Sequence, residues 1–326
     1  MMRIGLFALG LALIGGTALA QTAPQPDPEA ARRMAEMRAA DVKRPDSVGT
    51  GPYAAIKEAD PALPDHTVYR PADLSKLGGK KLGVVVWGNG GCAADGASAR
   101  HHLAQIASYG YLVIAPGKIY SGPGALPRPA TAARGPDPAT GQLPPPATSA
   151  QDVLKGLDWA LAENGRDGSR YKGLIDPAQV AVAGHSCGGL QAIQAGADKR
   201  IKTVLVHNSG VFNDGKQSIS GMTVEKSLLK SLHTPTLYVL GGKGDVAWPN
   251  GTDDYARIDH IPVALLDADV GHGGTFREDN GGDVGRFSVA WLNWQLRGDA
   301  EAGKLFKGAD CGLCKDPKWK IERKGI

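Results

Sequence analysis

The chain has 326 residues, of which 42% are hydrophobic and 21% charged, and its net charge is +4. This composition is typical of a globular protein and excludes a disordered or fibrous chain. A nucleic-acid partner is not expected, because binding one needs a larger basic face, and the basic residues between Lys315 and Lys324 are interpreted as a solvated tail.

Residues 1–20 are typical of a secretory signal peptide. Arg3 supplies the positive charge, Ile4–Leu13 is an apolar stretch, and Ala18–Ala20 matches a small-x-small cleavage site. An uncleaved anchor is the alternative, but it would need roughly 20 apolar residues. We therefore expect a periplasmic or secreted protein of a Gram-negative bacterium, without stable insertion into the membrane.

Three further regions follow the signal peptide. Residues 21–50 are rich in Ala and Pro and are interpreted as a linker or a loosely docked arm, in which Glu29–Ala40 could form a helix. A globular domain is expected over residues 51–307. Residues 308–326 form a C-terminal tail with a CxxC motif.

Within the domain, short apolar runs typical of strands alternate with stretches of helical spacing. The predicted strands are Leu82–Trp87, Tyr111–Ala115, Gln179–Ala183, Thr203–His207, Thr236–Leu240 and Val263–Asp267. The predicted helices are Ala99–Tyr109, Ser149–Asn164, Gly189–Ala197 and Val284–Gln295. This alternation predicts an α/β fold, with a mostly parallel central sheet and helices on both faces.

A Pro/Gly/Ala-rich insertion occupies residues 117–148. It follows a predicted strand, so it should leave the sheet at its carboxyl edge, where open α/β sheets bind ligands. Loops of this length are usually functional or disordered. The insertion is interpreted either as a lid or substrate wall, or as a surface excursion without a role.

The segment GHSCGG around Ser186 lies between a predicted strand and a predicted helix, as a nucleophile elbow does. Such a turn exposes the serine Oγ on a strained backbone, and the residues two positions before and after it must be small. Gly184 and Gly188 meet this requirement, whereas a nucleophile at Cys187 would have His185 two positions before it. The sequence therefore predicts Ser186 as the nucleophile.

A serine nucleophile needs a base, and hydrolases with this elbow carry the acid and then the histidine after the serine. His272 follows the last predicted strand in a glycine-rich loop and is predicted to be the base. Asp245 follows the strand Thr236–Leu240 and is predicted to orient His272. Other aspartates remain open as the acid: Asp214, Asp253, Asp254, Asp267 and Asp269.

Two backbone N–H groups should form an oxyanion hole for the developing charge on the substrate. We assign them to Cys187, directly after Ser186, and to Asn89 in the glycine-rich turn after a strand, with Gly90 as the alternative. Cys92 follows the turn that holds Asn89, and Cys187 follows Ser186. Because both segments should meet at the site, the two cysteines could form a disulfide that fixes the two donors relative to each other. Two separate buried thiols are the alternative.

The CxxC motif of Cys311 and Cys314 favours a local disulfide. No further zinc ligands lie nearby, and an exported protein meets an oxidising environment, in which disulfides persist. The expected chemistry needs neither a metal nor an organic cofactor.

In chain order, the GHSCGG elbow, the Asp245 loop and the GHGG segment at His272 resemble the α/β-hydrolase superfamily. Gly51–Pro71 and Pro235–Val239 are similar to segments of secreted cutinase-like and polyester hydrolases and of dienelactone-hydrolase-like proteins. The resemblance covers residues 51 to about 300 and implies an α/β-hydrolase fold.

We therefore expect a secreted serine esterase that acts on a small-molecule or polymeric ester through an acyl-enzyme. An amidase or peptidase with the same triad, and a non-catalytic binding protein of the same fold, are alternatives. Trp87, Tyr120 and Trp248 could line a substrate pocket or pack in the core. The sequence leaves the oligomeric state open.

Overall fold

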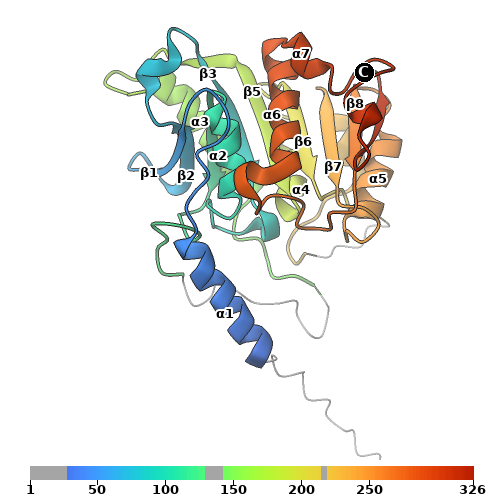
Figure 1. The fold of residues 1–326 in the computed structure, drawn as a ribbon, viewed down its shortest axis with the longest axis horizontal. Helices are drawn as coiled ribbons and strands as arrows, with labels where there is room; N and C mark the ends of the chain where they lie inside the picture. The colour runs from blue at the N-terminus through green and yellow to red at the C-terminus, as the bar shows by residue number, and fades with distance from the viewer. Residues whose placement is uncertain (1–27, 129–141, 214–218) are drawn as a thin grey trace, which may run out of the picture.

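The computed structural model describes residues 28–128, 142–213 and 219–326 (Figure 1). The predicted signal peptide, residues 1–20, lies outside these ranges, as does the middle of the 117–148 insertion. No helix within the described ranges is long and apolar enough to cross a membrane.

The described residues form one nine-stranded sheet, in the order β1-β2-β4-β3-β5-β6-β7-β8-β9. The strands are β1 (Ala55–Asp60), β2 (Leu63–Pro71), β3 (Leu82–Gly88), β4 (Tyr111–Pro116), β5 (Ile175–His185), β6 (Thr203–His207), β7 (Thr236–Leu240), β8 (Val263–Asp267) and β9 (Lys320–Lys324). Neighbours from β4 to β8 pair in parallel, whereas β1, β2 and β9 pair antiparallel. The predicted α/β fold with a mostly parallel sheet is confirmed.

Helices cover both faces of this sheet. The helices of the described residues are α1 (Pro28–Lys43), which does not cover the sheet, α2 (Arg100–Ser108), α3 (Ala150–Gly165), α4 (Cys187–Ala195), α5 (Trp248–Arg257), α6 (Gly282–Arg297) and α7 (Ala300–Gly303). The 3₁₀ turns include η1 (Leu74–Leu77), η2 (Gly90–Cys92), η4 (Lys226–Ser231), η5 (Asp279–Gly281) and η6 (Leu313–Lys315). Helices α2 and α6 pack together in front of the sheet in Figure 1, and α3 packs against α4 on the opposite face.

The central strands are continuous apolar runs because helices bury both of their faces. Strand β3 is buried along its whole length. Val84 and Val86 belong to the core beneath α3 and α4, whereas Val85 and Trp87 belong to the core beneath α2 and α6, as the two-residue period of a strand requires. The parallel strands therefore end at one edge, where the loops after β3, β5, β7 and β8 meet.

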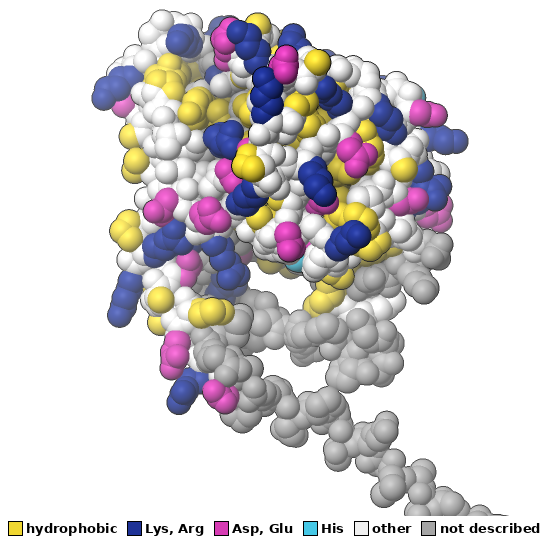
Figure 2. Space-filling model, turned by 45° about the vertical axis from the view of Figure 1, so that its right-hand side comes forward, with side chains coloured by type: hydrophobic (Ala, Val, Ile, Leu, Met, Phe, Trp, Pro, Cys, Tyr) yellow, Lys and Arg dark blue, Asp and Glu magenta, His cyan; other side chains and the backbone are white. Residues whose placement is uncertain are grey.

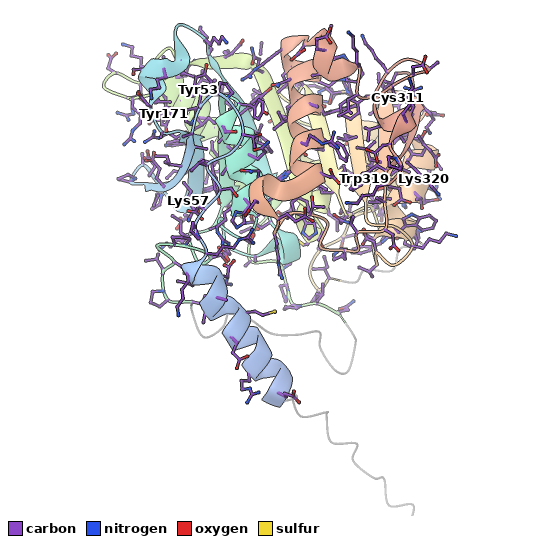
Figure 3. The ribbon with its side chains drawn as sticks, in the orientation of Figure 1. Tyr53, Lys57, Tyr171, Cys311, Trp319 and Lys320 are labelled. Atoms are coloured by element: carbon purple, nitrogen blue, oxygen red, sulfur yellow. A yellow bond between two sulfur atoms is a disulfide. The ribbon has the colours of Figure 1, made fainter. Side chains whose placement is uncertain are left out.

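Residues 308–326 are less solvated than the sequence indicates. Strand β9 pairs antiparallel with β8, and Trp319 is only 1% exposed. A disulfide between Cys311 and Cys314 closes the turn that leads to this strand, and Figure 3 shows Cys311, Trp319 and Lys320 at the same side of the molecule. The alternating pattern of β9, KIERK, is too polar to signal a strand, but its charges suit a sheet edge.

The arm at residues 21–50 contains the expected helix, which is α1 and projects from the body in Figure 1. Its C-terminal end is tied to the body by ion pairs, from Asp41 to Arg100 and from Arg44 to Asp279. On the face shown in Figure 2, Lys and Arg side chains are scattered among acidic ones and do not gather into one patch.

Candidate active site

Ser186 occupies the turn between β5 and α4, with φ 54° and ψ −125°. This region of backbone space is strained for a residue with a side chain, so the surrounding structure must hold it. The Ser186 amide donates to the carbonyl of His207 at 2.9 Å, and the Ser209 hydroxyl donates to the carbonyl of Ser186 at 2.7 Å. The backbone at Ser186 is therefore fixed from the neighbouring strand β6.

Close backbone approaches explain the glycines around Ser186. A Cβ added at Gly184 would lie 2.0 Å from the carbonyl oxygen of Gly188, and one at Gly188 would lie 2.1 Å from the carbonyl of Gly88. Contacts this short do not occur at real side chains, so these positions exclude any larger residue. The backbone at the start of α4 therefore contacts the backbone at the ends of β3 and β5 directly, with no side chain between them.

Ser186, His272 and Asp245 lie in one chain of hydrogen bonds. The Nε2 atom of His272 is 2.9 Å from the Oγ of Ser186, and its Nδ1 is 2.6 Å from the Oδ1 of Asp245. The Asp245 side chain is fully buried, whereas that of His272 is 36% exposed. Because a carboxylate can only accept, Asp245 keeps the proton of a neutral His272 on Nδ1 and leaves Nε2 free to accept from the serine.

The carboxylate of Asp245 is held ionised by its donors. Burial alone would raise its pKa, but hydrogen bonds from His272, the Ala247 amide and Asn208 bring the pKa below its usual value. The amide of Gly241 also donates to Oδ2, at 3.1 Å. This buried negative charge can stabilise a positively charged His272.

Asn208 is a residue of this site that the sequence reasoning missed. It follows β6, is 1% exposed, and has a left-handed backbone with φ 45°. Its Nδ2 donates to the Oδ2 of Asp245 at 2.8 Å and to the carbonyl of Gly271 at 3.1 Å. Asn208 therefore joins the acid loop to the loop that carries His272. The one signal in the sequence is an asparagine directly after a strand, since Asn tolerates this backbone better than most residues.

Replacing Asn208 with glycine is expected to lower kcat about 10-fold, because Asp245 and the His272 loop lose a shared donor worth about 1.5 kcal/mol. Glycine accepts the positive φ without strain, so the change tests the amide side chain rather than the backbone. Steady-state kinetics with a soluble ester would measure the effect. A kcat within twofold of wild type would show that Asn208 does not position the pair.

The other aspartates are engaged elsewhere. Asp267 accepts from the indole of Trp248 at 2.9 Å. Asp254 is buried in an ion pair with Lys226, and burial raises its pKa to about 6 despite that partner. Asp253 pairs with Arg257, and Asp269 is exposed. Asp214 lies outside the described residues. The described geometry thus singles out Asp245 as the carboxylate bound to His272.

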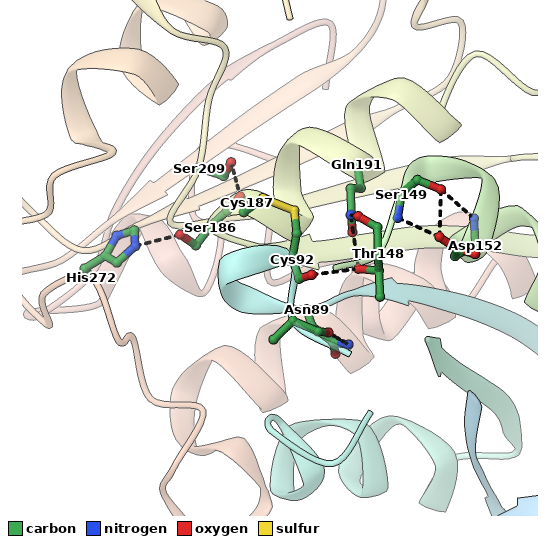
Figure 4. Close-up of a disulfide and its surroundings, with 11 residues drawn as sticks. Asn89, Cys92, Thr148, Ser149, Asp152, Ser186, Cys187, Gln191, Ser209 and His272 are labelled. Carbon is green, nitrogen blue, oxygen red and sulfur yellow. Dashed lines mark hydrogen bonds between the residues drawn. A yellow bond between two sulfur atoms is a disulfide. The ribbon is translucent and has the colours of Figure 1, made fainter. Parts of the chain in front are cut away.

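The loop after β3 lies beside the start of α4, where Figure 4 shows a disulfide between them. Cys92 and Cys187 form this disulfide, with their Cα atoms 5.2 Å apart. Asn89 is fully buried, and its Nδ2 donates to the carbonyls of Ala93 and Pro116 at 2.9 and 2.6 Å. The structure therefore brings the two residues predicted as oxyanion donors, Asn89 and Cys187, to neighbouring segments.

His185 connects the elbow to the base loop. Its Nε2 lies 2.8 Å from the carbonyl oxygen of His272, so this nitrogen carries a proton and donates. Burial lowers the pKa of His185 to about 4, which is consistent with a neutral ring. A Cβ at Gly90 would lie 2.7 Å from the Nδ1 of His185, so the ring also contacts the loop after β3.

Behind His185, a cluster of buried rings fills the core at this edge. Trp87, His102 and His207 are fully buried and lie within ring contact of Phe276. Trp87 is thus a core residue and does not line a substrate pocket. Neither ring nitrogen of His102 or His207 has a hydrogen-bond partner among the described residues. Burial lowers the pKa of His102 to about 3 and that of His207 well below its usual value.

We expect the protein to lose stability as the pH falls from 6.5 towards 4.5. In the unfolded chain His102 and His207 bind protons below about pH 6.5, whereas in the folded chain they stay neutral. Each of the two histidines should therefore lower the free energy of unfolding by about 1.4 kcal/mol for every unit by which the pH falls in this window. Thermal unfolding between pH 7.5 and 4.5 would measure this slope.

Variants of the two histidines test whether His102 and His207 cause this dependence of stability on pH. His102→Phe should flatten the slope, because it keeps a ring and removes one titrating group. His207→Phe should flatten it in the same way, since His207 is also fully buried. An equal slope in His102→Phe and wild type would contradict the assignment.

Two cavities lie beside the segment where the 117–148 insertion ends and α3 begins. One, of 570 Å³, is lined mainly by residues 146–152 and 221–223, and the other, of 320 Å³, includes His66, Lys118 and Tyr120. Tyr120 thus lines a cavity, but this cavity is not a pocket at the predicted nucleophile. Neither lining includes Ser186 or His272. No group of three or more His, Cys, Asp or Glu within the described ranges could hold a metal ion.

No family model and no curated protein matches this chain. The chemistry of the site therefore follows from its own residues, their distances and their burial.

Proposed function

We propose that the protein is a serine hydrolase of the α/β-hydrolase fold that cleaves carboxylic esters through an acyl-enzyme. The observation that carries the proposal is the hydrogen-bonded chain from Ser186 through His272 to buried Asp245, with links of 2.9 and 2.6 Å. A nucleophile, a base and a buried acid at hydrogen-bonding distance are what acyl transfer requires.

In the proposed mechanism the Oγ of Ser186 attacks the ester carbonyl while Nε2 of His272 takes its proton. Asp245 stabilises the resulting imidazolium and holds its orientation. His272 then returns the proton to the leaving alcohol, which departs and leaves an acyl group on Ser186. A water molecule, deprotonated by His272, attacks the acyl-enzyme and releases the carboxylic acid.

The tetrahedral intermediates need donors for their oxyanion. The amide of Cys187 suits this role because it lies in the first turn of α4, where N–H groups lack partners within the helix. The amide of Asn89, on the loop bonded to Cys187 through Cys92, is the proposed second donor. Two disulfides agree with an oxidising compartment, so we propose that the mature protein is periplasmic or secreted.

A panel of p-nitrophenyl esters graded by acyl length, together with a fluorophosphonate probe, tests the proposal. Turnover of esters and covalent labelling of Ser186 are expected. Faster turnover of matched p-nitroanilides would favour the amidase or peptidase alternative. Absence of both turnover and labelling would leave a non-catalytic binding protein.

A further inference from the structure

We infer that the Cys92–Cys187 disulfide positions the two oxyanion donors, so that acyl transfer at Ser186 depends on this pair being oxidised. The inference rests on the proposed function and adds to it a requirement for oxidation. The disulfide would then set the positions of the oxyanion donors in addition to stabilising the fold.

The disulfide joins two segments that are remote in sequence and adjacent in the site. Its cysteines are 95 positions apart, and one directly follows Ser186 while the other ends η2. Asn89 precedes η2 and has an extended backbone, φ −80° and ψ 148°. Cys92 itself has a left-handed backbone, with φ 46°. Such a residue needs support from its surroundings to keep its conformation.

Other contacts hold the loop only in part. The side chain of Asn89 is anchored to Ala93 and Pro116, which fixes it to β4 and not to α4. Strand β3 pairs with β5 as far as Gly88 and Gly184, and Gly88 touches Gly188 through bare backbone. These contacts hold the start of the loop, but the pairing does not continue past Gly88. The disulfide is therefore the direct bond between the donor loop and the nucleophile helix.

The end of the insertion reinforces the same junction (Figure 4). The carbonyl of Cys92 accepts from the amide and the hydroxyl of Thr148, both at 3.0 Å. Gln191, one turn after Cys187 on α4, donates its Nε2–H to the carbonyl of Thr148 at 2.5 Å. Cys92, Thr148 and Gln191 are all buried. If the disulfide opens, the hydrogen bonds of Thr148 to Cys92 and to Gln191 still connect the loop to α4, but through an intermediate residue and without a covalent bond.

The redox step uses a dithiol reductant such as dithiothreitol. The S–S bond breaks, each sulfur takes up one electron and one proton to become a thiol, and the dithiol closes into its own disulfide. Cys92 and Cys187 are 0% and 4% exposed, so reduction should be slow, whereas exposed Cys314 makes the second disulfide the first to open. Variants without the cysteines avoid this barrier.

The experiment compares wild type with Cys92→Ala/Cys187→Ala, which keeps the amide of residue 187, and with Cys311→Ser/Cys314→Ser as the matched control. Removing the inner disulfide should lower kcat about 10- to 100-fold, somewhat less than the loss of one oxyanion donor, and change KM less than threefold. The control should retain wild-type kcat. Assays run well below the melting temperature of each variant separate chemistry from stability.

Amide hydrogen exchange supplies a readout that needs no substrate. Opening the inner disulfide should speed exchange over residues 89–93, both in the double alanine variant and after slow reduction of the Cys311→Ser/Cys314→Ser protein. Unchanged exchange there, or faster exchange with unchanged kcat, overturns the inference. A wild-type protein that turns over no ester or amide overturns the proposed function instead, so the two failures are distinguishable.

Discussion

Ser186→Ala should abolish ester hydrolysis, with kcat reduced by about 10⁵- to 10⁶-fold. The Oγ of Ser186 is the atom that lies 2.9 Å from Nε2 of His272, and alanine leaves no nucleophile in its place. The residual rate should come from binding and the oxyanion donors alone. Hydrolysis of a short-chain p-nitrophenyl ester under saturating conditions measures the effect, and labelling by a fluorophosphonate should be lost with it.

Ser209→Ala is the control for this substitution. Ser209 also lies at the carboxyl edge, but its hydroxyl donates to the carbonyl of Ser186 and does not contact His272. Ser209→Ala keeps the Oγ of Ser186 and should therefore keep the covalent label, while its kcat should fall by no more than about 10-fold, because one hydrogen bond to the strained backbone of Ser186 is lost. Ser186→Ala should melt close to wild type. Labelling that persists in Ser186→Ala would refute the assignment of the nucleophile.

Asp245→Asn should lower kcat by about 10⁴-fold while leaving KM and the fold nearly unchanged. The amide of asparagine can donate to Nδ1 of His272, which would place the proton of the neutral ring on Nε2. Nε2 could then no longer accept from Ser186. The Oδ1 of Asp245 lies 2.6 Å from Nδ1 of His272, so an amide nitrogen in the place of this oxygen would be close enough to donate to the ring.

Aspartates near Asp245 in sequence or space provide the comparison. Exposed Asp269 lies just before His272, and Asp269→Asn should retain activity within a few-fold. Asp267→Asn keeps one of the two acceptors that Asp267 offers to Trp248 and to the Gly242 amide, and it should also retain activity within a few-fold. A loss of about 10⁴-fold in either variant, with Asp245→Asn active, would move the acid to that residue.

Local patterns were sufficient to predict the sheet and the elbow. The six central strands are continuous apolar runs, and this pattern follows from burial of both faces, which acts on each strand separately. The glycines two residues before and after Ser186 reflect contacts within one strand–turn–helix unit, so they too can be read from a single segment. Strands β1 and β9 carry weaker signals, because they are the edge strands of the sheet and need little apolar surface. Strand β2 is buried over most of its length but contains polar residues such as His66 and Arg70, so it too lacks an apolar run.

The sequence alone predicted the strand–turn–helix elbow at Ser186, the loop of His272 after the last parallel strand, and the α/β sheet. Each of these depends on residues that lie close together in the chain. Only the tertiary structure decided which aspartate meets His272, that Asn208 joins the two loops, that Trp87 is core, and that Cys92 bonds Cys187. Those outcomes depend on distances between segments tens of residues apart. Such distances are set by packing of the whole sheet and its helices, and no local pattern records them.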